Sequence, residues 1–170
     1  QPFFDFGIRG QNEIVTIIDS GIDHRHCFYH DPKREVPFDK TDFQHRKIVR
    51  YQVISDIYDG ENGHGTHVSG IIAGQSLCHN CSCSMYNGIA PESKIFFVDA
   101  GEEKDPVSLT QHYSFSNIVE IAKSMNSYVF SNSWGFPPST KKVRQIFDRI
   151  AFQNPFISFI FGAGNSKHWF

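Results

Sequence analysis

Two short segments of this 170-residue chain carry residue types that could do catalytic chemistry. Residues 17–21, Ile-Ile-Asp-Ser-Gly, form an apolar run that ends in Asp19, and residues 63–70, Gly-His-Gly-Thr-His-Val-Ser-Gly, place His64 between two glycines. A carboxylate at the end of a buried strand is costly to desolvate, and a histidine N–H is its usual partner at a catalytic site. The two segments therefore predict an Asp–His pair of the kind that activates a nucleophile.

The surroundings of His64 indicate how its ring would be held. Three apolar residues at helical spacing follow it: Val68, Ile71 and Ile72. This pattern predicts that His64 lies at the start of a helix, where the helix dipole disfavours a protonated imidazole. A neighbouring Asp19 would offset that effect and fix the tautomer, leaving the other ring nitrogen free to act as a base.

Both motifs also allow simpler interpretations. Asp19 could form an Asx-turn with the backbone that follows it. His64 and His67 could share a helix face and bind a metal ion, but no third ligand stands at a recognised spacing and the Glu of an H-E-x-x-H site is missing. Gly162 and Gly164 resemble the opening of a dinucleotide-binding fingerprint that lacks its third glycine and following helix.

The elements that must position these residues alternate along the chain. Short apolar runs predict strands at 13–18, 48–54, 94–98, 128–130 and 156–161. Apolar faces predict helices from His64, over 115–122 and over 143–151, the last capped by Ser139 or Thr140. The alternation predicts an α/β fold, a mostly parallel sheet with helices on both faces and its sites at the carboxyl ends of the strands.

Two predictions concern the less regular parts of the chain. Residues 23–63 are polar and aromatic, so we expect a long surface connection that shapes a site. Residues 156–161 are apolar except for Ser158, so we expect a core strand there.

The composition narrows the class of protein. With 39% hydrophobic and 20% charged residues, the chain is of globular type and can build one core. A net charge of -2 gives no electrostatic argument for binding nucleic acid or an anionic membrane. No apolar run reaches the roughly 18 residues of a membrane helix, and no signal-peptide pattern precedes residue 20. Because the chain begins with Gln1, we expect a mature form or a fragment.

The four cysteines leave several arrangements open: Cys27, Cys78, Cys81 and Cys83. In an oxidising compartment they could form two disulfides, with three possible connectivities, or they could stay free. A metal site with His79 is a further alternative, but the spacing lacks the second paired half of a usual zinc site.

The motifs together resemble the Asp and His signatures of the subtilisin-like serine peptidases, the subtilases, in the order in which that family has them. Further matches follow along the chain: Gly88-Ile89-Ala90-Pro91, Ser131-Asn132-Ser133-Trp134-Gly135 and Ala163-Gly164-Asn165. The Asn-Ser-Trp-Gly sequence is similar to that of the branch that contains the oxidatively stable alkaline proteases and related protozoan enzymes. The resemblance implies a subtilisin-like three-layer α/β fold and hydrolysis of peptide bonds.

The resemblance also implies roles for individual residues. His64 would be the general base and then the general acid, and Asp19 would orient it. Asn165 would supply the side-chain amide of the oxyanion hole. Ser133, Trp134 and Gly135 match the segment that pairs with the substrate backbone, while Gly162, Ala163 and Gly164 would form a wall of the first specificity pocket. Taken without the resemblance, Asn165 could be a turn residue and Trp134 a buried anchor.

The chain departs from the family pattern at the nucleophile. Subtilases carry it in a Gly-Thr-Ser-Met-Ala segment, which does not occur in these 170 residues. We therefore interpret residues 1–170 as part of a peptidase S8 catalytic domain, inactive alone, with the serine expected beyond residue 170. A natural two-chain enzyme and a catalytically inactive, peptide-binding relative are the alternatives.

The remaining expectations follow from the resemblance. The chemistry would need no cofactor, although structural calcium is plausible in this family and no oxygen-ligand loop is recognisable. Protein or peptide substrates, an N-terminal inhibitory propeptide before Gln1, and a secreted or vesicular location are implied. Side-chain preference stays open.

Overall fold

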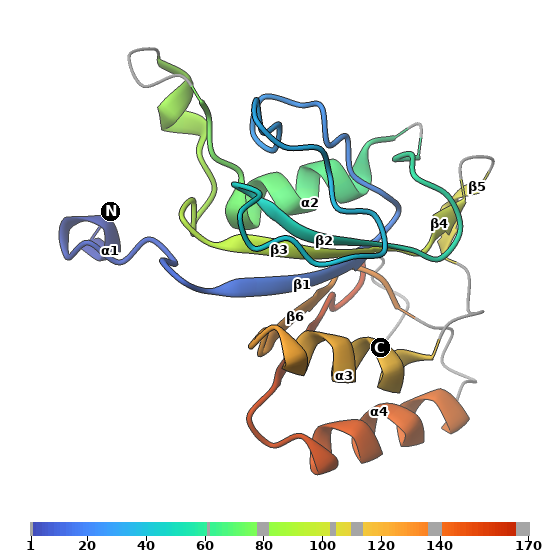
Figure 1. Cartoon of the computed structure of the whole chain (residues 1–170). Helices are drawn as coiled ribbons and strands as arrows, with labels where there is room; N and C mark the ends of the chain where they lie inside the picture. The colour runs from blue at the N-terminus through green and yellow to red at the C-terminus, as the bar shows by residue number, and fades with distance from the viewer. Residues whose placement is uncertain are drawn as a thin grey trace.

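A computed structural model describes residues 2–60, 62–77, 82–102, 105–109, 114–135 and 141–165. Its centre is a five-stranded sheet with the order β2-β3-β1-β6-β7 (Figure 1). The strands are β1 Ile14–Asp19, β2 Ile48–Val53, β3 Lys94–Asp99, β6 Val129–Asn132 and β7 Ser158–Phe161. Every neighbouring pair in this sheet runs parallel. The predicted parallel sheet is confirmed.

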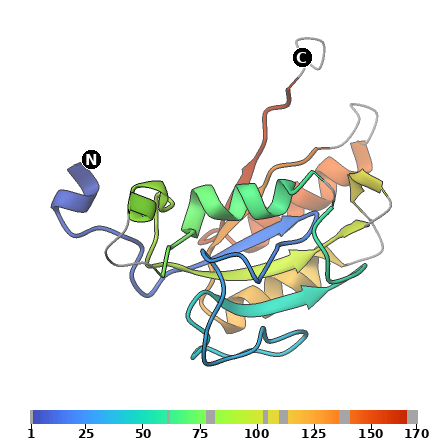
Figure 2. The same cartoon turned by 90° about the horizontal axis from the view of Figure 1, so that it is seen from above.

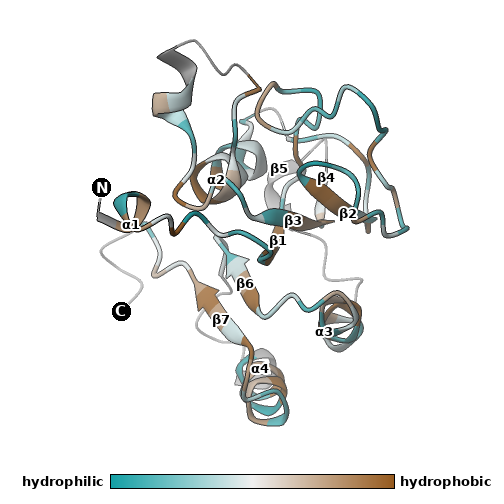
Figure 3. Ribbon diagram, turned by 60° about the vertical axis from the view of Figure 1, so that its left-hand side comes forward, coloured by the Kyte–Doolittle hydropathy of each residue, from teal (hydrophilic) through white to brown (hydrophobic). Residues whose placement is uncertain are grey.

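Helices cover both faces of the sheet, as predicted. Helix α2 (His64–Ala73) lies on one face, whereas α3 (Phe115–Ser124) and α4 (Lys141–Gln153) lie on the other (Figure 3). The smaller elements are α1 (Pro2–Asp5), the 3₁₀ turn η1 (Ser82–Tyr86) and an antiparallel pair of β4 (Gly101–Glu102) and β5 (Asp105–Leu109). Ser139 and Thr140, the predicted caps of α4, lie outside the described residues.

The sheet separates two apolar clusters because its central strands are buried on both faces. On β3, Ile95 and Phe97 belong to the cluster that includes Ala73 of α2. Phe96 belongs to the opposite cluster, with residues of α3 and α4 such as Ile118. The continuous apolar sequence of β3 thus fills two cores, as expected for a central parallel strand.

The connection over 23–63 is only partly a surface segment. The strand predicted at 48–54 is present as β2 of the main sheet, and Tyr29, outside that strand, has a relative exposure of 1%. Some polar residues of this connection form internal hydrogen bonds. The Arg46 guanidinium, for example, donates to the carbonyl oxygens of Cys27, His30 and Gln75 at 3.0, 2.6 and 3.1 Å.

The prediction of a core strand at 156–161 is wrong in its burial. Strand β7 is the outermost strand, with β6 as its neighbour. Phe156 is 87% exposed and Ile160 is 56% exposed. Ile157 and Phe159 are partly buried and pack against the core cluster that includes Phe96. The chain that follows β7 runs out beyond the carboxyl edge of the sheet (Figure 2).

Candidate active site

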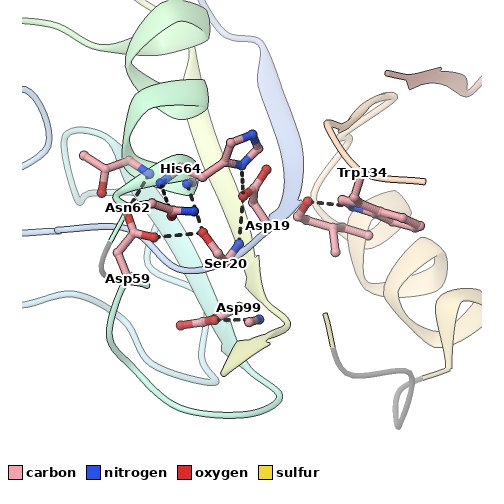
Figure 4. A network of polar contacts seen from close by, with 11 residues as sticks. Asp19, Ser20, Asp59, Asn62, His64, Asp99 and Trp134 are labelled. Atoms are coloured by element: carbon pink, nitrogen blue, oxygen red, sulfur yellow. Dashed lines mark hydrogen bonds and ion pairs between the residues drawn. The ribbon is translucent and has the colours of Figure 1, made fainter. Parts of the chain in front are cut away.

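The centre of the candidate site is a short hydrogen bond between Asp19 and His64 (Figure 4). Asp19 is the last residue of β1 and is 2% exposed, whereas His64 is the first residue of α2 and its side chain is 45% exposed. His64 Nδ1 and Asp19 Oδ1 are 2.6 Å apart. Because an ionised carboxylate can only accept, Nδ1 is the donor, and Nε2 is left with a lone pair that can take up a proton.

Only one oxygen of the Asp19 carboxylate has hydrogen-bond partners among the described residues. Its Oδ1 also accepts a hydrogen bond from the backbone N–H of Ser20 at 2.8 Å. Among the described residues no donor reaches the buried Oδ2. The orientation of Asp19 is therefore fixed by Ser20 and His64 alone in this part of the chain.

Two glycines allow the motifs to meet. Gly21 has a φ of +118°, and a Cβ there would overlap the backbone of Tyr58. A Cβ on Gly65 would overlap the carbonyl oxygen of Gly21. The first turn of α2 therefore packs directly on the backbone that leaves β1, which is what brings His64 within reach of Asp19.

The first turn of α2 has its own set of acceptors. Gly63 stands at the N-cap position and has no side chain to accept from the helix. The backbone N–H groups of His64, Gly65 and Thr66 donate instead to Asn62 Oδ1, Ser20 Oγ and Asp59 Oδ2, at 3.2, 3.1 and 3.0 Å (Figure 4).

Asp99, which the sequence did not single out, lies beside the site. It ends β3 in register with Asp19, is fully buried, and accepts a hydrogen bond from the Tyr51 hydroxyl at 2.5 Å. Burial raises the pKa of Asp99 to about 8. Asp99 is therefore mostly protonated at neutral pH and adds little negative charge next to Asp19. The predicted strand stopped at residue 98, so no sequence signal marked this carboxyl group.

The segment 133–135, predicted to pair with substrate, follows the end of β6. Ser133 and Gly135 are exposed, whereas Trp134 is half-buried. The Trp134 indole N–H donates to the carbonyl oxygen of Ile18 at 2.9 Å, so this side chain points into the protein beside Asp19 (Figure 4). Its ring also contacts Phe147 of α4. The structural role of Trp134 as an anchor is thus visible, and contact between this segment and substrate stays a prediction.

The predicted oxyanion segment directly follows β7. Gly162 N–H donates to Asn132 O at 2.9 Å, and the next residues, Ala163, Gly164 and Asn165, are exposed beyond β7. Gly164 has a φ of +96°. The side-chain bonds of Asp19 and His64 join the two residues to each other, and none reaches 163–165 in the described chain. The role of Asn165 therefore stays a prediction.

Other predicted features are partly outside the described residues. Cys27 is an exposed free thiol, whereas Cys78, Cys81 and the side chain of Cys83 are not described. Within the described ranges, no cluster of three His, Cys, Asp or Glu side chains could hold a metal ion. No described helix combines the length and the apolar character that a membrane span requires.

Comparison with known proteins decides the family. The profile described as "Subtilase family" (Peptidase S8) matches residues 10–169. The chain belongs to the subtilase family. Among curated relatives of this subtilase, the serine protease/ABC transporter B family protein tagB of Dictyostelium discoideum is 34% identical over 131 residues, which cover 77% of this chain and 7% of tagB. The related tagA is 33% identical over 172 residues, covering 99% of this chain and 9% of tagA.

Solved structures agree on the fold. The CspB protease of Clostridium perfringens matches with a TM-score of 0.70 and 18% identity, covering 96% of this chain and 38% of CspB. The subtilisin-like protease Apa1 of Pseudoalteromonas sp. AS-11 matches with a TM-score of 0.59 and 24% identity, covering 91% of this chain and 31% of Apa1. The subtilase described here therefore spans less than a tenth of its curated relatives and less than half of these structures.

Proposed function

We propose that this chain is the Asp- and His-bearing part of a serine endopeptidase. The observation that carries the proposal is the 2.6 Å bond from His64 Nδ1 to the buried carboxylate of Asp19. That bond leaves Nε2 available as a base, and the negative charge of Asp19 stabilises the imidazolium that forms when Nε2 takes up a proton. Family membership supports the same reaction class.

The proposed mechanism is acyl transfer through a serine outside these 170 residues. His64 Nε2 removes the serine proton as Oγ attacks the scissile carbonyl, and returns a proton to the leaving amine. Asn165 is proposed to donate to the oxyanion, Ser133 and Gly135 to pair with the substrate backbone, and Ala163 and Gly164 to form a pocket wall.

A second candidate function is peptide binding without cleavage. The family match is compatible with both functions. Against the second candidate stands the assembled Asp19–His64 bond, which a binding module does not need. The alternative predicts binding of extended peptides without covalent labelling by serine-directed reagents.

The setting of the enzyme is also a proposal. Protein or peptide substrates follow from the family, and a propeptide and a secreted or vesicular location are proposed on the same ground. The curated relatives whose names join a serine protease to an ABC transporter are compatible with the vesicular option. Structural calcium stays a proposal that rests on the family resemblance, and no step here uses a metal ion.

His64→Ala in the longest product of the gene tests the proposal. We expect burst-phase acylation of an ester or peptide substrate to disappear, with turnover lower on the order of 10⁶-fold. The matched control is His67→Ala, one turn further along α2, which should retain most of the burst. Undiminished cleavage by His64→Ala would defeat the assignment. Equal loss in both variants would point instead to a shared role of the two histidines.

A further inference from the structure

The start of α2 depends on groups from outside the helix. The first N–H groups of a helix have no partner within it and need acceptors. The N-cap residue usually supplies one through its side chain, but here that residue is Gly63, with a φ of +63°. The groups that replace the missing N-cap acceptor therefore determine the position of His64, because His64 is the first residue of the helix.

Asp59 supplies the charged part of that replacement and ties it to β1. Its Oδ2 accepts from Thr66 N–H at 3.0 Å, while its Oδ1 accepts from the Ser20 hydroxyl at 2.9 Å. The same Ser20 oxygen accepts from Gly65 N–H at 3.1 Å. One carboxylate thus bridges the residue that follows Asp19 and the residues that follow His64 (Figure 4).

The backbone around Asp59 strengthens the bridge. The N–H of Gly60 donates to the carbonyl oxygen of Ser20 at 3.3 Å, and Gly63 N–H donates to Gly60 O at 2.8 Å. The loop that carries Asp59 is therefore bonded to β1 on one side and leads directly into α2 on the other. Movement of this loop would displace His64 relative to Asp19.

We propose that Asp59 is a positioning residue for the reaction: through Ser20 and the first turn of α2 it holds His64 on Asp19. This inference rests on the proposed peptidase function for its kinetic consequences. The geometry on which it stands is independent of that function.

Two substitutions separate position from charge. Asp59→Ala removes both hydrogen bonds, and we expect kcat/KM to fall about 10- to 100-fold because small misplacements of a catalytic group have effects of this size. Asp59→Asn keeps an acceptor for Thr66 but removes the charge. We expect a smaller fall in kcat/KM for this variant.

Asp23→Asn is the matched control. Asp23 lines the same hollow beside α2, but its carboxylate accepts from Arg25 N–H at 3.1 Å rather than from the helix. Asp23→Asn therefore removes a carboxylate from the same hollow without breaking the bridge, and its kcat/KM should stay close to the wild-type value. An equal fall in Asp23→Asn and Asp59→Asn would show that the effect is one of general charge, which would overturn the specific role of Asp59.

A measurement without substrate distinguishes this inference from the peptidase proposal. The Nδ1 proton of His64, held in the bond to Asp19, should give a far-downfield proton NMR signal that persists in Asp59→Asn and broadens or disappears in Asp59→Ala. If the wild-type protein cleaves nothing but shows this pattern, the peptidase proposal fails and the positioning role stands. If Asp59→Ala keeps both the signal and wild-type kcat/KM, the positioning role is wrong.

Discussion

The two parts of the candidate site differ in how completely they are built. At the junction of β1 and α2, each backbone N–H of the first helical turn from 64 to 66 has a side-chain acceptor, and Asp19 contacts His64 at 2.6 Å. At the carboxyl ends of β6 and β7, the segments 133–135 and 163–165 are mostly exposed.

The two parts of the site are held in different ways. The acid–base pair is held by contacts between two neighbouring pieces of chain, one leaving β1 and one entering α2. The oxyanion and substrate segments depend on strand ends near the edge of the sheet, where Phe161 is 41% exposed. We therefore expect substitutions at the junction to have the largest effect on kcat, and those near β6 and β7 to have smaller effects.

Asp19→Asn should give the largest effect in the junction after loss of His64 itself. The asparagine amide fits the site, but it can no longer fix the tautomer or stabilise the imidazolium. We expect kcat to fall about 10⁴-fold with little change in KM. Steady-state kinetics on a peptide substrate measures this, with circular dichroism as the folding control. A fall of less than tenfold would mean that the Asp19–His64 bond is not part of the reaction.

Asn165→Ala tests the open part of the site. If its amide donates to the oxyanion, kcat should fall by about 10² to 10³ with KM nearly unchanged. Asn165→Asp is a matched variant, because it keeps the size and loses the donor, and it should be at least as slow. An unchanged kcat in both variants would assign Asn165 to the turn after β7 and would leave the junction as the whole of the described site.

Asp99→Asn tests the neighbourhood of Asp19 through the pH dependence of the free energy of unfolding. Its folded-state pKa of about 8 lies above the usual 3.8, so between these values the folded protein keeps a proton that the unfolded chain has released. The free energy of unfolding should then fall as pH rises through this window, by up to about 1.4 kcal/mol per pH unit.

The asparagine variant removes this dependence. The free energy of unfolding of the variant should therefore rise relative to that of the wild type from pH 5 to pH 7.5, as measured by urea unfolding. Asp5→Asn, an exposed carboxylate in α1, serves as the control. Parallel stability curves for wild type and Asp99→Asn would contradict the raised pKa.

Trp134→Phe should have the smallest effect. Phenylalanine keeps an aromatic ring against Phe147 but leaves the Ile18 carbonyl oxygen without the indole donor. We expect a loss of about 1 kcal/mol in the free energy of unfolding, with kcat changed less than KM. A large rise in KM without any loss of stability would indicate that the indole contacts substrate.

The sequence predicted the regular elements because their apolar periods are clear. Short apolar runs predicted strand β1, the start of α2 at His64 and the parallel sheet. In each run, the spacing of the apolar residues indicates which side chains are buried. The Asp19–His64 contact could be anticipated because a buried carboxylate needs a partner and the parallel topology gathers strand ends at one edge.

The remaining features depend on tertiary contacts that no local pattern records. Asp59 lies in an irregular loop, and its role arises from its contacts with Ser20 and Thr66. Asp99 gains its raised pKa from burial beside Tyr51, a partner 48 residues away. The burial of β7 was predicted wrongly because an apolar run indicates a strand but not its position in the sheet.

The most direct test of the central claim is labelling of the longest gene product with a fluorophosphonate, followed by identification of the modified residue. We predict covalent labelling of a serine outside residues 1–170, abolished in His64→Ala and retained in His67→Ala. No labelling of the wild type, or equal labelling when His64 is replaced, would contradict the claim that the Asp19–His64 pair serves a serine nucleophile.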